Sequence, residues 1–416
     1  MDFQLEYNKA IARSNSLSPG KYFLVFMLIA VSGNPLFPYL TEWSFILFAA
    51  LLSFVAVVSR KPLISRLLLV IFAAFSFLFL LQYLGLEKVS IPANVNRLAK
   101  IYCGFLVMTI VGTQFRETFL RVMVFICAVS LVGWAYLVVQ GSMPGLEFGR
   151  YTSLFFFNLT HEIEPEYGFT IRNSGMFWEP GAFQGYINLA ILLYLGDFRK
   201  FFSEHKKSFL ILSLALVTTQ STTGYIVYAF LMAFFIFTSI RRFWIKVFVL
   251  SCVGAAAVWG FTSIDFLIDK FKEEYVRAHE LRPGDSDWSR SGAAIIAVEN
   301  LKRHPYIGNG DLMESRYLGL GNDMDGSGNG FFGELNVIGI PAMLVYLFLL
   351  FRYYPYKKKY KFIFVFTVIL LLQGESFLNY PIFYALYFIQ YPPPEAEIDP
   401  KTIGYKYYKK YLKIAG

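Results

Sequence analysis

The sequence is poor in charge and in the side chains that bind metals. Only 16% of its 416 residues are charged and 56% are hydrophobic, whereas soluble domains carry about 25% charged residues. None of the 3 cysteines or 4 histidines stands at the spacing of a metal site. No Gly-x-x-x-x-Gly-Lys-Ser/Thr phosphate loop is present, which argues against ATP-driven transport. The composition predicts an integral membrane protein, and we expect neither metal nor cofactor.

Apolar runs recur along nearly the whole chain, at about the 20 residues that a membrane-spanning helix needs. The last two runs are short and leave open a single long helix in their place. The predicted fold is all-α, with a polytopic transmembrane domain over 1–391 and a basic cytoplasmic tail over 392–416. We predict spans at about 22–40, 43–59, 63–84, 98–114, 117–140, 176–195, 206–222, 223–240, 243–262, 328–351, 362–374 and 375–391, twelve in all.

The basic residues predict the orientation. Most of the 38 Lys and Arg fall in short segments between apolar runs, as the positive-inside rule requires of cytoplasmic loops. Both termini are then cytoplasmic, and two long loops, at about 141–175 and 263–327, form an extracytoplasmic cap. The second loop contains an amphipathic helical pattern from Ser291 to Arg303. Because topology explains the net charge of +9, we expect the lipid bilayer and not a nucleic acid as a partner.

The stretch that leads into the sixth span combines charge with the chemistry of a helix start. It reads RNSGMFWEPGAF from Arg172 to Phe183. Pro180 suits the first turn of a helix, and Glu179 beside it meets the positive end of the helix dipole. A well-capped helix start explains these two residues without any function. Arg172 is either anchored among lipid headgroups or binds a phosphate group bidentately.

Three further polar residues are candidates, each with a simpler explanation beside it. Glu334 is predicted about one and a half turns into a span, where an ionisable side chain is costly and usually functional. The alternative for Glu334 is a position still at the interface. Arg290 in the second long loop is either a solvated side chain or a second phosphate contact. Asn329, in GSGNG, either orients a sugar hydroxyl or only forms a turn.

These stretches together resemble the O-antigen polymerase and O-antigen ligase family. The pattern R-x-x-G-x-F-x-E-P-G-x-F at 172–183 is similar to the start of a middle span in that family, and QSTTG at 220–224 resembles its short turn between spans. WSR at 288–290 with HPYIGNG at 304–310 resembles the Arg … Pro-x-x-Gly-x-Gly pattern of its large loop. GNGFFGEL at 328–335 resembles the start of the next span. The resemblance covers about residues 170–350.

The resemblance implies a multi-pass glycosyltransferase of the bacterial inner (plasma) membrane, of the lipid-linked-donor, GT-C-like type. As a polysaccharide polymerase it would join undecaprenyl-pyrophosphate-linked oligosaccharides into O-antigen, the polysaccharide of lipopolysaccharide, or another surface polysaccharide, on the extracytoplasmic face. A chain-length regulator in the membrane would be a further partner. Arg172 and Arg290 would bind pyrophosphate, with Asn329 and His304 as further contacts to pyrophosphate or glycan. Glu179 or Glu334 would accept the proton of the attacking hydroxyl.

Two alternatives to a polymerase stay open. Ligases often carry His where this chain has Gly328, so the sequence argues against an O-antigen ligase. A second departure from the family pattern concerns phosphate binding: family members often carry Arg where this chain has Thr222, so one expected phosphate contact is missing. The other alternative is a lipid-linked oligosaccharide flippase or transporter. Transport favours charged residues deep within several helices, and the predicted spans contain few of them.

Overall fold

The computed structural model describes residues 18–37, 44–140, 146–148, 151–154, 158–161, 171–239, 242–244, 247, 251, 290–316, 328–353 and 358–389. Most of the described residues are helical. The α-helices are α2 (Pro19–Gly33), α4 (Ser44–Val58), α5 (Arg66–Gly85), α6 (Ile91–Val111), α7 (Phe115–Gln140), α8 (Pro180–Leu192), α9 (Phe198–Glu204), α10 (Lys206–Thr218), α11 (Thr222–Ser239), α14 (Arg290–Leu301), α15 (Met313–Arg316), α16 (Gly330–Tyr353), α17 (Lys358–Leu372) and α18 (Pro381–Ala385). Short 3-10 helices are η1 (Gly112–Gln114), η3 (Phe377–Asn379) and η4 (Leu386–Phe388).

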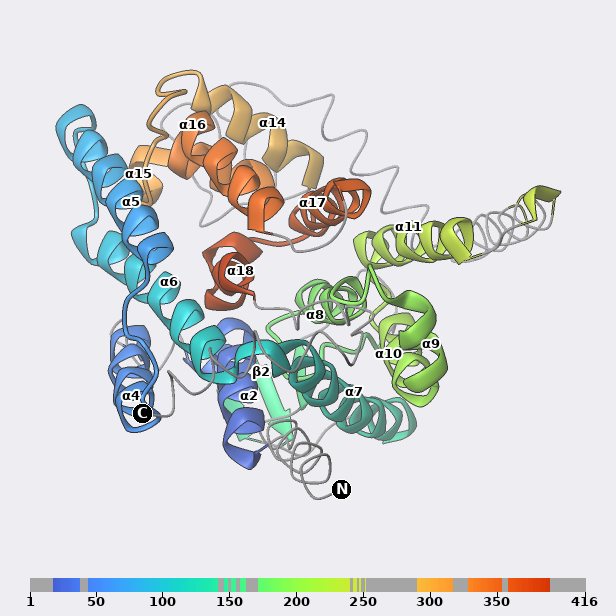
Figure 1. Ribbon diagram of the computed structural model, residues 1–416. Coiled ribbons are helices and arrows are strands. Elements are labelled where there is room, and N and C mark those ends of the chain that lie inside the picture. Colours follow the sequence, from blue (N-terminus) through green and yellow to red (C-terminus); the bar gives the residue numbers. More distant parts are fainter. Residues whose placement is uncertain are drawn as a thin grey trace.

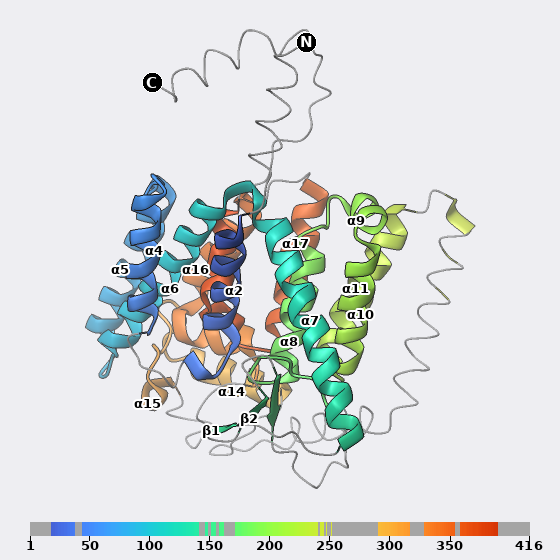
Figure 2. The same ribbon diagram turned by 90° about the horizontal axis from the view of Figure 1, so that it is seen from below.

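The long helices stand side by side, and α18 lies in the middle of them (Figure 1). Figure 2 shows α14, α15 and a small sheet at one end of this bundle and α9 at the opposite end. The sheet is antiparallel, in the order β1 (Leu146–Phe148), β2 (Tyr151–Leu154) and β3 (Asn158–His161). The described parts of the two predicted long loops therefore lie on the same side of the molecule. Which side faces the cytoplasm stays a prediction.

The described chain is a helical membrane protein. Three helical segments are long and apolar enough to cross a membrane: Arg66–Gly85, Ile91–Gln140 and Gly330–Arg352. The second of these contains α6 and α7, joined through η1. Shorter apolar helices are Pro19–Gly33, Ser44–Val58, Thr222–Thr238 and Tyr360–Leu372. Large apolar side chains point outward from several helices, such as Phe54 at 67% exposure and Leu84 at 72%, as suits a lipid-facing surface.

The long described helices overlap predicted spans, but several of them begin, end or break at other residues than predicted. The span predicted at 98–114 begins earlier, at Ile91, which brings Arg97 inside α6. The span predicted at 375–391 is not one continuous helix, because η3, α18 and η4 follow each other there after α17 has ended at Leu372. The predicted span at 243–262 and the tail at 392–416 lie outside the described residues, apart from isolated positions. The number of spans and the GT-C-like type stay predictions.

The cap contains one predicted element and one that was not predicted. The amphipathic helix expected from Ser291 to Arg303 is confirmed as α14, which packs against α16. Its buried residues Ala293, Ile296, Ala297 and Leu301 follow helical spacing. The three-stranded sheet of the first loop has no counterpart among the predicted elements, because strands of 3 or 4 residues are too short to show an alternating pattern.

Helix α16 is kinked, and the loop after α14 fills the kink. Gly339 has φ of 77° and a proline follows two residues later, so neighbouring backbone groups lose their helical partners. The loop replaces those partners. Pro305 O accepts from Ile340 N at 2.9 Å, and Gly310 N donates to Val337 O at 3.1 Å. The PYIGNG motif therefore has a structural role, which is to attach the cap to α16.

Candidate functional site

Arg172 is held against the turn between α10 and α11. Its Nε donates to the carbonyl oxygen of Thr219 at 3.1 Å. The next residue, Asn173, donates from its backbone N to Thr218 O and from Nδ2 to Thr218 Oγ1, both at 2.9 Å. The QSTTG stretch begins in this turn, so two of the motifs that carry the family resemblance meet in space. These bonds fix the guanidinium of Arg172 at the end of the bundle.

Glu179 occupies the N-cap position of α8. Its backbone is extended, with φ of −159° and ψ of 163°, and Pro180 is the first residue of the helix. The preceding residue, Trp178, donates its backbone N to Gly33 O at 3.2 Å and so ties this helix start to the end of α2. The predicted helix start at Pro180 is confirmed. The positive end of the α8 dipole stabilises a negative charge on Glu179.

A second carboxyl group, absent from the sequence-based candidates, lies beside Glu179. Glu375 stands in the turn between α17 and η3, and a side-chain hydrogen bond joins it to Glu179. The indole Nε1 of Trp178 donates to Glu375 Oε2 at 3.3 Å. A Cβ added at Gly181 would lie 2.5 Å from Glu375 Oε1 and 2.6 Å from Glu179 Oε1. Glycine at this position therefore leaves room for a close carboxyl pair over the first turn of α8.

Arg290 reaches the same place from the second long loop. It is the first residue of α14 and lies close enough to Arg172 and Glu375 for their charges to interact. Asn329 holds its backbone, because Nδ2 donates to Arg290 O at 3.3 Å and to Gln373 Oε1 at 2.9 Å. The Oδ1 of Asn329 accepts a backbone N–H in the first turn of α16 at 3.1 Å, as an N-cap does. These contacts give Asn329 a structural role, between α14, α16 and α17.

We call Arg172, Glu179, Arg290 and Glu375 the arginine–carboxyl cluster. Burial lowers the pKa of Arg172; the carboxyl of Glu179 opposes that effect, and the charge of Arg290 adds to it. Two carboxyl groups that hydrogen-bond to each other must hold a proton between them. The cluster then carries two positive charges and one negative charge. This surplus of positive charge suits an anion.

Glu334 lies in a different, buried group of charges. Arg97 of α6 pairs with Glu334 of α16 and, at 2.9 Å, with Asp311 in the loop after α14. It also donates to Tyr384 Oη at 3.2 Å. We call these four residues the Arg97 cluster. The side chain of Glu334 is therefore turned toward Arg97 and lies in a different cluster from Glu179.

A second buried cation follows Arg97 on the same face of α6. Lys100 is 9% exposed, its Nζ donates to Asn379 Oδ1 at 3.1 Å, and it lies 4.9 Å from the centre of the Phe45 ring. Neither cation is among the sequence-based candidates. The available signal was a pair of basic residues three positions apart at the edge of an apolar run.

His304 is separated from the arginine–carboxyl cluster by the length of α14. Arg290 is the first residue of that helix, and His304 comes three residues after the last. Twelve residues of helix rise about 18 Å. The turn that carries His304 instead joins the loop at the kink of α16, where Gly308 N donates to His304 O at 2.8 Å. The structure thus does not bring His304 to the two arginines.

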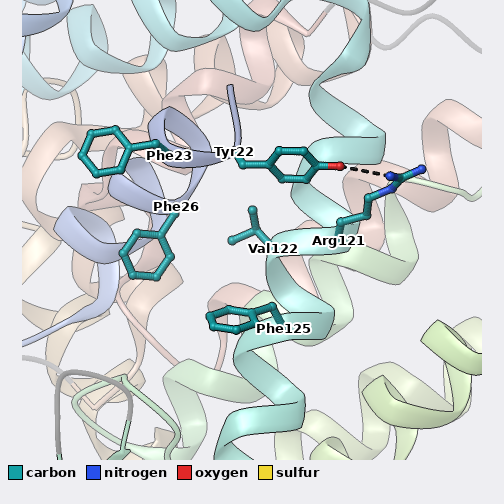
Figure 3. Close-up of a pocket in the computed structure, with 6 residues that line it drawn as sticks. All are labelled: Tyr22, Phe23, Phe26, Arg121, Val122 and Phe125. Carbon is teal, nitrogen blue, oxygen red and sulfur yellow. Dashed lines mark hydrogen bonds between the residues drawn. The ribbon is translucent and has the colours of Figure 1, made fainter. Parts of the chain in front are cut away.

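A surface groove lies between α2 and α7, away from this site. Its volume is about 310 Å³, and Figure 3 shows Tyr22, Phe26 and Arg121 among its lining residues. Arg121 donates to Tyr22 Oη at 3.0 Å. Tyr22 stands near the start of α2, whereas Gly33 at the end of α2 meets Trp178. The groove is therefore at the other end of α2 from the arginine–carboxyl cluster and does not belong to it.

The described ranges contain no group of three or more His, Cys, Asp or Glu side chains that could hold a metal ion. Comparison of the chain with models of protein families and with curated proteins finds no match. The fold and the site define a helical membrane protein with a positively charged cluster at one end of its bundle.

Proposed function

We propose that this protein is a polysaccharide polymerase that joins undecaprenyl-pyrophosphate-linked repeat units on the extracytoplasmic face of a bacterial inner membrane. One observation carries the proposal: Arg172 and Arg290, from separate segments of the chain, lie near each other beside a carboxyl pair. Like charges repel, so two close guanidiniums are stabilised by an anion that both can bind. The pyrophosphate of a lipid-linked sugar is such an anion.

The depth of the cluster suits a lipid-linked substrate. Glu179 stands at the N-cap of α8, Arg290 begins α14, and Glu375 lies in a turn after α17. All three are at ends of helices, at the end of the bundle that carries α14 and the small sheet (Figure 2). A pyrophosphate at the membrane edge, with its isoprenoid chain among the lipids, would meet both arginines at this level. Its glycan would extend toward the cap.

The proposed reaction asks two things of these residues. The bond between C1 of the donor sugar and the pyrophosphate oxygen breaks, and fixed guanidiniums stabilise the negative charge that grows on the departing group. The attacking hydroxyl of the second glycan loses its proton as its oxygen bonds to C1. Glu179, near Arg172, would accept that proton.

Transport of a lipid-linked glycan is the second candidate function. The observation in its favour is the Arg97 cluster with Lys100, since buried ionisable side chains within membrane helices often mark transport pathways. An O-antigen ligase would use the same donor chemistry as a polymerase. Gly328, at the position of the ligase His, supports the polymerase against it.

Purified protein in nanodiscs, supplied with a synthetic undecaprenyl-pyrophosphate-linked repeat unit, tests the proposal. We expect a ladder of longer lipid-linked chains, without nucleotide and in the presence of a chelator. Arg172→Ala and Arg290→Ala should each slow the reaction about tenfold to a hundredfold, because a hydrogen bond to a charged group contributes about 1.5–3 kcal/mol. Lys302→Ala, directly after the end of α14, is the control, because Lys302 is 66% exposed and pairs with Glu299 on the surface.

Three other outcomes would contradict the proposal. If the protein moves the lipid-linked unit across the membrane of liposomes and forms no ladder of longer chains, it is a transporter. Accumulation of full-length lipid-linked polymer in a deletion strain would indicate a ligase, whereas a polymerase deletion should leave single-repeat products. Normal chain lengths in both arginine variants would remove Arg172 and Arg290 from the site.

A further inference from the structure

The hydrogen bond between Glu179 and Glu375 requires one proton, because an ionised carboxylate can only accept. The two carboxyl groups have different surroundings. In the part of the chain that the structure describes, Arg172 before α8 and Arg290 on α14 act on the pair, and Tyr225 on α11 acts on Arg172. These differences indicate which carboxyl holds the proton.

The surroundings of Glu179 stabilise a negative charge. Glu179 is the N-cap of α8, and the partial positive charge of a helix N-terminus favours an anion at that position. Among the charged groups that act on Arg172, Glu179 has the largest effect, so this guanidinium and this carboxylate are close neighbours. Both effects favour the ionised form of Glu179.

The contacts of Glu375 match a protonated carboxylic acid. Its Oε2 accepts from Trp178 Nε1 at 3.3 Å, as the carbonyl oxygen of an acid does. Its Oε1 and Glu179 Oε1 lie 2.5 Å and 2.6 Å from the Cβ position of Gly181, and a side-chain hydrogen bond joins the two residues, so we assign the O–H group to this oxygen. Each oxygen of a protonated Glu375 then has one partner of the correct kind. The reverse assignment would place the proton at the N-terminus of a helix and beside Arg172.

We propose that Glu375 carries the proton and donates a hydrogen bond from Oε1 to Glu179, so that Glu179 is the single ionised base and Glu375 positions it. In the reaction, Glu179 takes the proton of the acceptor hydroxyl while that oxygen bonds to C1 of the donor sugar. The electron pair of the broken C1–O bond leaves with the pyrophosphate. The pair then holds two protons and releases one to solvent. This catalytic consequence rests on the proposed function; the location of the proton does not.

Infrared spectroscopy of the protein in nanodiscs tests which carboxyl group carries the proton, and it needs no substrate. We expect the C=O stretching band of a protonated carboxylic acid in the wild type at neutral pH, and its loss in Glu375→Gln. Trp178→Phe should move the band to higher frequency, because Glu375 Oε2 loses its donor. Glu314→Gln should leave the band unchanged, because the Glu314 carboxylate is 70% exposed and pairs with Lys88. Absence of the band, or a band that Trp178→Phe does not shift, would overturn the proposal.

Rates of ladder formation test the positioning role. Glutamine at 375 keeps an N–H donor for Glu179 and a C=O acceptor for Trp178, so Glu375→Gln should polymerise near the wild-type rate. Glu375→Ala loses the donor and should be about tenfold to a hundredfold slower. Glu179→Gln removes the base and should lose about a hundredfold to ten-thousandfold in kcat. If Glu375→Gln is as slow as Glu179→Gln, the positioning role is wrong.

The pH profile gives a readout that a purely structural side chain would not move. As the pH rises, Glu375 ionises, the two carboxylates repel each other, and the wild-type rate should fall. Glu375→Gln cannot ionise at this position and should keep its rate over the same alkaline range. The same alkaline decline in both proteins would contradict the proposal. If the wild type forms no ladder at all, the proposed function fails and the infrared measurements alone decide where the proton lies.

Discussion

Replacement of Glu334 by alanine should cost stability and leave the chemistry intact. The side chains of Arg97 and Glu334 are 2% and 7% exposed, so the ion pair between them is buried. Removal of one partner of a buried pair destabilises a protein by about 3–5 kcal/mol, because the other charge stays buried without its partner. Arg97 keeps Asp311 at 2.9 Å, and we therefore expect about 3 kcal/mol, the lower end of that range. This is more than a hundredfold in the ratio of folded to unfolded protein, at about 1.4 kcal/mol per factor of ten.

Two measurements on the same preparation separate stability from chemistry. Thermal unfolding in nanodiscs should show a lower Tm for Glu334→Ala than for the wild type. The rate of ladder formation, measured per folded molecule at a temperature where both proteins stay folded, should be unchanged. Glu314→Ala is the matched control. It also loses an ion pair at the same end of the bundle, but its carboxylate is 70% exposed, and exposed pairs contribute little to stability.

A specific result would refute this reasoning. If Glu334→Ala unfolds at the wild-type temperature and polymerises about a hundredfold more slowly, Glu334 takes part in the reaction and not in the packing. Glu179→Gln should show the opposite pattern to that expected for Glu334→Ala, with an unchanged Tm and a large loss of kcat. The two variants together therefore decide between the carboxylates that the sequence left as alternatives for the base.

The remaining predictions concern packing and sidedness. Gly330→Ala should lower both the yield of folded protein and its activity, because a Cβ there would overlap the backbone carbonyl of Glu375. Gly20→Ala, where an added Cβ meets nothing within 4 Å, should behave as the wild type in the same gel-filtration and rate measurements. Thr160→Cys in β3 and Ser203→Cys in α9 lie at opposite ends of the bundle. An impermeant thiol reagent should label only Thr160→Cys in intact cells, and labelling of Ser203→Cys would contradict the predicted orientation.

The positions of the helices could be predicted because few backbone conformations are stable inside a membrane. Each spanning segment must satisfy its own N–H and C=O groups, so an apolar run of sufficient length becomes a helix. The run predicted at 63–84 became α5 (Arg66–Gly85) with small changes at its ends. The predicted start of the span that became α6, at residue 98, was wrong because a charged residue such as Arg97 usually marks the edge of an apolar run. It lies inside the helix only because Glu334 and Asp311, far along the chain, neutralise it.

The sequence predicted those residues of the candidate site that belong to one short motif. Arg172 and Glu179 belong to one short stretch, and the helix start at Pro180 placed both at a membrane edge. Glu375 carries no such local signal, because it is a single acid between two apolar runs in a part of the chain outside the resemblance. Its role arises from contacts with Trp178 and Glu179 that only the fold brings about. Asn329 caps the start of α16, a contact that neither of its two explanations named, and its role toward a sugar stays a prediction.

One segment, residues 373–384, connects the two clusters. Near its start, Glu375 forms the carboxyl pair, while Asn379 accepts from a lysine of α6 and Tyr384 accepts from Arg97. Apolar burial does little to hold such a segment inside a membrane, because lipid tails are as apolar as the protein interior. Polar contacts to α6 therefore add to close packing, since a Cβ at Gly104 would lie 2.7 Å from Pro381 O. Because Tyr384 and Asn379 belong to the same segment as Glu375, their contacts with Arg97 and Lys100 join both clusters to one short stretch of chain.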